Sequence, residues 1–301
     1  MTAWQEGTLC AVGTAFSWTL SALAFESASR RVGSLVVNLV RLVIAFGFLV
    51  LWNKFHRGLW WPSDASRDRW IYLSLSGLIG FFIGDMALFR AFVVMGARLS
   101  TLFMSLAPPM AALIGYLVLG ERIPLTGWVG MVVTLSGIMW VVAERVKEED
   151  PRALRRVTVS GIALGVVAAL GQAVGAVFSK RGMQGGYDPA ASTQIRALAG
   201  IVGFTVMLTV IGYLPRVFAS LKKPAAMGQM TFGAFVGPFI GVTLFHAALQ
   251  RIQTGVAQTI TATIPVLIIP FVIVLYKEHV TPRAIFGSVV TVIGVAILVH
   301  G

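Results

Sequence analysis

The chain has 301 residues, of which 57% are hydrophobic and only 12% are charged, and its mean hydropathy is +0.84. Soluble domains carry about 25% charged residues, so this composition excludes an ordinary soluble fold and predicts an integral membrane protein. The formal net charge is +12, from 24 Lys and Arg against 12 Asp and Glu, but most basic residues lie in short loops beside apolar segments, as membrane anchors do. We therefore do not expect nucleic-acid binding, which needs a basic stripe.

Ten apolar segments follow one another along the chain, each about as long as the roughly 20 residues that a helix needs to cross a hydrocarbon core. The first five helices are expected at 7–25, 34–52, 70–93, 98–119 and 124–143. The second five are expected at 158–179, 190–213, 228–249, 255–276 and 282–300. The longest polar stretch, 144–157, is interpreted as a charged linker between two halves, 1–143 and 158–301. The predicted fold class is an all-α integral membrane protein with ten transmembrane helices.

The two halves repeat each other. When residues 77–142 are shifted by 157 positions without a gap, several Gly, Pro and Glu residues coincide. The matched pairs include Gly80 with Gly237, Gly84 with Gly241, Pro108 with Pro265, and Glu121 with Glu278. Because each half has an odd number of helices, a duplicated unit must adopt opposite orientations in the bilayer. This is the inverted-repeat plan of many secondary transporters.

At this point the chain resembles a known family. The blocks LGERIPLTGWVGMVVTLSGIMWVV (119–142) and YKEHVTPRAIFGSVVTVIGVAILV (276–299), with the prolines of the fourth and ninth helices, resemble EamA-type members of the drug/metabolite transporter superfamily. The second block departs slightly, with Lys277 where the first has Gly120. The resemblance covers nearly the whole chain. It implies ten helices, a central cavity lined mainly by helices one, three, four, six, eight and nine, and export of small metabolites or amino acids.

The membrane orientation follows from the resemblance more than from loop charge. The loops opposite the N-terminus contain more Lys and Arg, but the excess comes from the linker 144–157, so the positive-inside rule does not decide. The resemblance implies that both termini are cytoplasmic. We expect a multi-pass protein of the cell membrane, which in a bacterium is the inner membrane.

Three ionisable residues within the expected helices are candidates for substrate binding or coupling, because charges inside a bilayer are costly. Asp85 is the only acidic residue well inside a helix. It is interpreted either as a proton acceptor or partner of a cationic substrate group, or as a static ion pair with Arg41 or another cation. Arg41 and Arg196 occupy matching positions in helices two and seven. They are interpreted as shared framework, as a gate, or as binding groups for a carboxylate or phosphate.

Asp85 and His246 break the repeat symmetry, since their repeat mates are Val242 and Phe89. A substrate has no twofold symmetry, so unmatched polar groups are candidates for recognising it. His246 is the only histidine well within a helix. It is interpreted either as a neutral core residue or as a proton-handling group.

Further candidates are uncharged or lie at helix ends. Trp18, Gln172, Gln258 and Ser105 offer stacking and hydrogen bonds, although such residues also simply join membrane helices. Pro108 and Pro265 remove helix hydrogen bonds at matching depths, which favours either a cavity wall or a packing kink. Glu26 and Lys180 end helices one and six with opposite charge and are candidate gate residues or ordinary interface residues. Glu121 and Glu278 precede helices five and ten, where an acidic group favours the N-terminal dipole.

No Cys and His cluster has zinc spacing and no phosphate-binding glycine loop is present, so we expect no metal, no other cofactor and no ATP hydrolysis. Energy is expected from an ion gradient, with protons as one possible coupling ion, from exchange, or from the gradient of the substrate itself. The sequence favours a secondary exporter of small molecules, not an enzyme, that works by alternating access. The alternatives are a passive channel and a membrane-embedded enzyme that acts on lipid-linked substrates, with His246 and Asp85 as an acid–base pair. A monomer and a homodimer both stay open.

Overall fold

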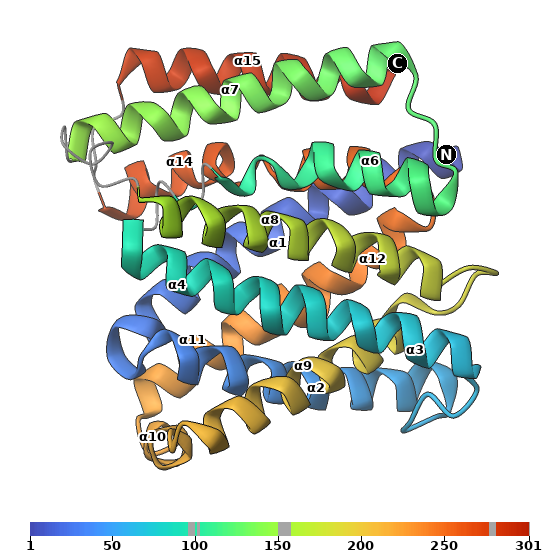
Figure 1. Cartoon of the computed structure of the whole chain (residues 1–301), viewed down its shortest axis with the longest axis vertical. Helices are drawn as coiled ribbons and strands as arrows, with labels where there is room; N and C mark the ends of the chain where they lie inside the picture. Colours follow the sequence, from blue (N-terminus) through green and yellow to red (C-terminus); the bar gives the residue numbers. More distant parts are fainter. Residues whose placement is uncertain (96–99, 101–102, 150–157, 277–280, 301) are drawn as a thin grey trace.

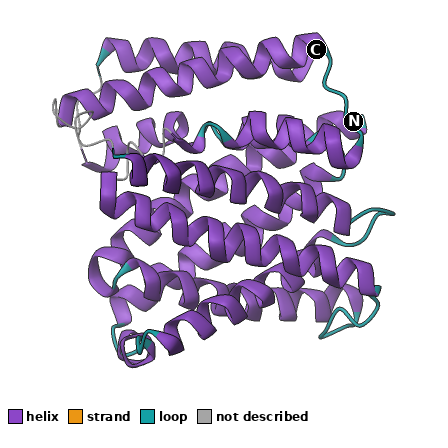
Figure 2. Ribbon diagram, viewed as in Figure 1, coloured by secondary structure: helices purple, strands orange, loops and turns teal. Residues whose placement is uncertain are grey.

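The structure, a computed structural model, describes residues 1–95, 100, 103–149, 158–276 and 281–300 (Figure 1). All regular secondary structure within these ranges is helical (Figure 2). The expected all-α fold is therefore confirmed.

The helices of each half follow one another in the expected order. The first half contains α1 (Ala3–Val32), α2 (Ser34–Arg57), α3 (Arg67–Ser76), the π-helix η1 (Gly77–Gly84), α4 (Asp85–Met95), α6 (Ala107–Leu119) and α7 (Leu125–Glu149). The second half contains α8 (Val159–Gly182), α9 (Pro189–Val210), α10 (Leu214–Ser220), α11 (Pro224–Ala234), the π-helix η3 (Phe235–Gly241), α12 (Val242–Leu249), α13 (Thr254–Thr261), α14 (Ile264–Tyr276) and α15 (Pro282–His300). Within the described residues, nine helical segments are long and apolar enough to cross a membrane, and α6 is a shorter tenth. This approximately matches the predicted ten helices.

Several helix ends differ from the expected bounds. α1 begins before residue 7 because Thr2 and Gln5 form a capping box, in which the Thr2 hydroxyl accepts from the Gln5 backbone N–H at 3.2 Å. α7 continues through 144–149, so the first part of the expected linker is helical, and 150–157 lie outside the described residues. The seven-residue helix α10 between the seventh and eighth expected helices was not predicted, because so short a segment has little periodicity to read.

The expected third, fourth, eighth and ninth helices are irregular at positions related by the repeat. The third and eighth contain the π-helices η1 and η3, and residues 77–84 shifted by 157 are 234–241. The fourth and ninth are interrupted by turns at 105–106 and 262–263, just before Pro108 and Pro265. Proline lacks an N–H and cannot complete the helix hydrogen bond to the fourth residue before it. Both prolines thus lie in the first turn of the helical segment that follows the interruption.

The two halves run in opposite directions through the bundle. The N and C termini lie at the same end, which we call the terminal end (Figure 1). α1 begins at the terminal end, whereas its counterpart α8 begins at the opposite end, beside the end of α7 (Figure 1). α1 packs against both halves, on α2, α11, α12 and α13, and α7 pairs along its length with α15. Because α1 contacts helices of both halves, it lies at the boundary between them.

Candidate functional site

A cavity of about 360 Å³ lies between the helices of the two halves. Eight of the twelve residues singled out in the sequence line this cavity, and they are Trp18, Arg41, Asp85, Ser105, Pro108, Gln172, Gln258 and Pro265. Most of the remaining wall is apolar, with Phe25, Leu42, Phe81, Leu88, Ile138 and Ile264 among the residues that sequence reasoning did not single out. Nothing separates these six from the many other apolar residues of a membrane helix, so only the tertiary structure identifies them.

The depth of the cavity follows from the residues of α1 that line it. Trp18 lies near the middle of this 30-residue helix and Phe25 lies further from the terminal end. At a rise of about 1.5 Å per residue, Trp18 is roughly 22 Å along the helix from Ala3. The cavity therefore occupies the middle of the bundle and the part beyond it, away from the terminal end.

A chain of polar contacts crosses the cavity wall. Asp85 forms an ion pair with Arg41 through Oδ2 and accepts a hydrogen bond from Gln172 Nε2 on Oδ1 at 3.1 Å. Gln258 Nε2 in turn donates to the backbone oxygen of Gln172 at 3.3 Å. These four residues belong to α2, α4, α8 and α13, so the chain of contacts joins both halves. The ion pair that the sequence offered as one reading of Asp85 is present, and it lies in the cavity wall.

Arg196 and His246 do not line this cavity but form a separate buried cluster. His246 is 0% exposed, and its ring nitrogens lie 2.9 Å from Thr193 Oγ1 and 3.1 Å from Ser179 Oγ. Arg196 donates from Nη1 to the same Ser179 hydroxyl at 3.3 Å, and its guanidinium stacks on the Phe81 ring at 4.2 Å. The structure thus separates Arg196 from its repeat mate Arg41, which alone of the two reaches the cavity.

The two candidate gate residues lie in different settings. Lys180 Nζ forms an ion pair with Glu121 Oε1 at 2.6 Å and donates to the Ile252 backbone oxygen at 2.7 Å. Glu26 lies near the other end of α1, where it pairs at 2.6 Å with Arg30 one turn away, and both side chains are more than half exposed. Of these two residues, Lys180 forms an ion pair between the two halves, whereas Glu26 pairs within its own helix.

Glu121 has a different partner from the one its sequence position suggested. It was expected to favour the N-terminus of the helix that follows it, here α7. Instead its carboxylate accepts from the backbone N–H of Thr254 at 2.9 Å and from the Thr254 hydroxyl at 3.0 Å, so it caps α13 in the other half. Its repeat mate Glu278 lies outside the described residues. We call the contacts of Glu121, Lys180 and Thr254 the latch.

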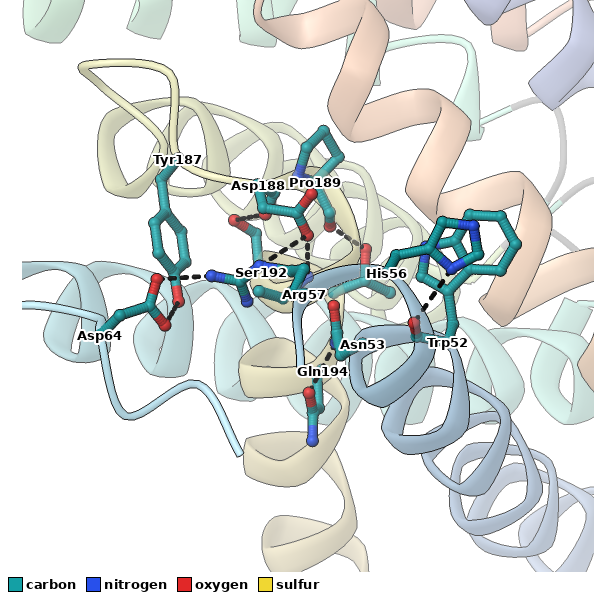
Figure 3. A network of polar contacts seen from close by, with 12 residues as sticks. Trp52, Asn53, His56, Arg57, Asp64, Tyr187, Asp188, Pro189, Ser192 and Gln194 are labelled. Atoms are coloured by element: carbon teal, nitrogen blue, oxygen red, sulfur yellow. Dashed lines mark hydrogen bonds and ion pairs between the residues drawn. The ribbon is translucent and has the colours of Figure 1, made fainter. Parts of the chain in front are cut away.

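A second polar network lies at the terminal end and was not predicted (Figure 3). Arg57 at the end of α2 pairs with Asp64 at 2.5 Å and approaches Asp188, the N-cap of α9, at 4.0 Å. The Tyr187 hydroxyl donates to Asp64 at 3.2 Å. Burial, with a further contribution from Asp64, raises the pKa of Tyr187 to about 12, so this hydroxyl keeps its proton at physiological pH. The Asp188-Pro189 helix start is the sequence signal that would have indicated this network.

The comparisons with known proteins agree with this architecture. The profile of the EamA-like transporter family matches residues 5–143 and again residues 159–300. An uncharacterized transporter from Archaeoglobus fulgidus is 22% identical over 292 residues, which cover 94% of this chain and 95% of that protein. A solved crystal structure superposes with a TM-score of 0.74 at 17% identity and covers 98% of this chain and 97% of its own. At that identity the likeness shows the fold alone.

Proposed function

Because the chain belongs to the EamA-like transporter family, we propose that this multi-pass membrane protein is a secondary transporter that exports small metabolites, such as amino acids or amphipathic compounds, by alternating access. The observation that carries the proposal is the cavity of about 360 Å³, whose mostly apolar wall holds the Arg41–Asp85 ion pair and two glutamines. Small-molecule sites have volumes of about 300–1,000 Å³ and combine apolar walls with a few placed polar groups.

The inverted halves supply the motion. Rocking of one half against the other exposes a midplane cavity first on one side of the membrane and then on the other. In the conformation described, the latch joins Glu121 of the first half to Lys180 and Thr254 of the second. These contacts must separate when the cavity opens toward the terminal end. The turns before Pro108 and Pro265, both in the cavity wall, are the points at which the fourth and ninth helices bend.

Different residues of the cavity wall make different kinds of contact with the substrate. Arg41 and Asp85 recognise charge, and Asp85 also provides the coupling to protons, because it is the acidic group in the cavity wall. Gln172, Gln258 and Ser105 supply hydrogen bonds, and Trp18 supplies an apolar face for the substrate. The protein resides in the cell membrane with both termini in the cytoplasm. The described conformation is then closed by the latch on the cytoplasmic side.

Counterflow in liposomes tests the transport function. Vesicles that contain the purified protein and an unlabelled solute should accumulate the same labelled solute, at a rate that saturates with concentration. A passive channel gives flux without counterflow or saturation. A screen of amino acids, organic acids, nucleobases and cationic amphiphiles covers the substrate classes. A folded protein that moves none of them by counterflow would contradict the proposal.

Asp85→Asn tests the coupling role. Asn has nearly the same shape, and its amide oxygen still accepts a hydrogen bond from Arg41 or from Gln172, but it does not titrate. We expect a folded protein whose transport rate is flat between about pH 5 and pH 9, whereas Asp85→Glu should keep a pH dependence. The measurement is the initial counterflow rate in pH-clamped vesicles. A pH dependence that is unchanged in Asp85→Asn would refute proton coupling through this residue.

A further inference from the structure

We propose that the transported substrate is an amphipathic organic anion, which binds its acid group to Arg41 and its apolar part to the cavity wall. This inference rests on the proposed transport function and names the charge class of its substrate. It depends on an asymmetry between the two members of the cavity ion pair, on the charge of the buried groups around them, and on the aromatic rings that line the cavity.

The first observation is that Arg41 has unused donors, whereas Asp85 is engaged on both oxygens. A guanidinium carries five N–H donors and a carboxylate two acceptor oxygens. Asp85 accepts from Arg41 on Oδ2 and from Gln172 on Oδ1. Within the described part of the chain, the one hydrogen bond of the Arg41 side chain is the one from Nη2 to Asp85, and its Nε is buried without a partner. An unpaired N–H of a buried cation is costly and needs an explanation.

A carboxylate or phosphate is the ligand that fits these donors. Arginine binds such groups through two parallel N–H bonds, and the edge formed by Nε and one Nη is suited to this geometry. In Arg41 this edge pairs Nε with Nη2, so an acid group would use Nε and one N–H of Nη2 while the second N–H of Nη2 keeps the contact with Asp85. An ammonium group would instead have to compete with Arg41 and Gln172 for the oxygens of Asp85.

The second observation is the charge balance around the cavity. Arg196 is 3% exposed and has no ion pair within 4.0 Å among the described residues, yet it interacts electrostatically with Asp85. Two guanidinium groups, Arg41 and Arg196, thus share one carboxylate in this interior. The cluster has a formal charge of +1 in a medium of low dielectric constant, and an anionic ligand would neutralise it.

The third observation concerns the aromatic rings that line the cavity. Aromatic faces bind cationic ligands through cation–π interactions. Here the protein's own cations already occupy two of these faces, since Arg41 lies 5.4 Å from the Phe25 ring centre and Arg196 lies 4.2 Å from that of Phe81. A cationic substrate would meet the same rings beside two guanidinium groups. The cavity is therefore poorly suited to cationic amphiphiles.

An anionic substrate also agrees with export. A cell interior that is electrically negative drives anions outward, by roughly fifty-fold in the equilibrium concentration ratio for each 100 mV and unit charge. Such an exporter needs no ATP.

The test uses four compounds that share one phenylpropyl skeleton and differ in charge. These are 3-phenylpropionate, phenylalanine, 3-phenylpropylamine and 3-phenylpropan-1-ol, the anion, zwitterion, cation and neutral member. Binding to the purified full-length protein in neutral detergent and low salt is measured by calorimetry and by the shift in melting temperature. We expect the anion to bind at least about tenfold more tightly than the other three. Equal or tighter binding of the zwitterion or the cation would overturn the proposal, as would no binding of the anion up to about 10 mM.

Single substitutions test whether Arg41 is the residue that binds the anion. Arg41→Gln should weaken binding of 3-phenylpropionate at least about tenfold, and Arg41→Lys, which keeps the charge and loses the paired geometry, should restore part of it. Asp85→Asn should bind the anion at least as tightly as the unmodified protein. Arg90→Gln removes an exposed arginine outside the cavity and should leave binding unchanged. Loss of anion binding in Asp85→Asn, or full retention in Arg41→Gln, overturns the proposal, and the first outcome can be read even if Arg41→Gln fails to fold.

Three further outcomes separate this inference from an inorganic anion site, from a different substrate class and from a failure of the transport function. If chloride alone raises the melting temperature as much as equimolar 3-phenylpropionate, an inorganic anion satisfies Arg41 and the proposal is wrong. If counterflow detects transport but only of cations or zwitterions, the substrate class is wrong and the transport function stands. If 3-phenylpropionate binds through Arg41 but no solute of any charge is transported, the charge preference stands and the transport function is wrong.

Discussion

Single residues with the same degree of burial have different roles in this protein, because their hydrogen-bond partners differ. Asp85 and His246 are both buried and both break the repeat symmetry. Asp85 lines the cavity, beside a guanidinium with unused donors. His246 contacts Thr193, Ser179 and Arg196 instead, and no hydrogen bond joins it to Asp85 although the structure describes both side chains. The geometry therefore gives no support to an acid–base pair of these two residues.

His246→Phe tests whether His246 has a structural role. Phe is the residue at the matching position of the first half, Phe89, and it keeps a planar aromatic ring while removing both ring nitrogens. It leaves the buried Ser179 and Thr193 hydroxyls with fewer partners, so we expect a loss of about 1–3 kcal/mol in stability, seen as a lower melting temperature. The pH dependence of transport should not change. A folded His246→Phe protein with an altered pH profile would instead show that His246 takes part in proton handling.

Elements of this fold depart from regular helix geometry where they meet the cavity. The π-helices η1 and η3 directly precede Asp85 and Val242, both of which line the cavity. π-helical turns are rare and occur frequently at functional sites. Here α8 packs so closely on η1 that Gly84 faces Gly171 without room for a side chain, a close helix contact of the kind that small residues permit. The irregular turns thus lie between tightly packed segments and the cavity.

Charge reversal at the latch tests its role in alternating access. Glu121 is 8% and Lys180 21% exposed at the side chain, so either single reversal puts like charges together in a partly buried site. We expect Glu121→Lys and Lys180→Glu each to lower the counterflow rate about tenfold, and the double reversal to recover most of it. Glu26→Lys, at an exposed pair of the same type, is the control and should have no effect. A double variant no better than either single variant would contradict a pairwise latch.

The described conformation of the whole molecule is asymmetric along the bundle, although its two halves are related by a repeat. Both the latch and the network of Arg57, Asp64 and Tyr187 lie at the terminal end, whereas the cavity extends away from it. Which side of the membrane the described conformation closes therefore depends on where the termini lie. With cytoplasmic termini, it is closed to the cytoplasm.

A reporter fused after Gly301 tests this orientation. A fluorescent protein that matures only in the cytoplasm should be bright in this position, and alkaline phosphatase, which is active only in the periplasm, should be silent. A reporter in the loop between α2 and α3 should behave in the same way, because that loop lies at the terminal end (Figure 1). The opposite pattern at both positions would reverse the orientation.

From local sequence patterns alone, the membrane location, the approximate helix count and the repeat could be predicted, together with irregular backbone near Pro108 and Pro265. These properties depend on local composition and spacing, since a helix must satisfy its own backbone in lipid and a proline must interrupt it. The few polar residues inside the helices could also be recognised in this way, because each is costly there. Five of the polar residues recognised in this way, Arg41, Asp85, Ser105, Gln172 and Gln258, line the cavity.

Only the tertiary structure decided which of these residues act together. The repeat grouped Arg41 with Arg196 and Glu26 with Lys180, but the fold pairs Arg41 with Asp85 and Lys180 with Glu121. Internal symmetry relates positions in separate halves, whereas contacts depend on how the halves pack and which side chains face each other. An unused donor such as Arg41 Nε likewise becomes visible only when all its neighbours are in place. The substrate charge that we propose therefore depends on the packing of the helices and not on the residue types alone.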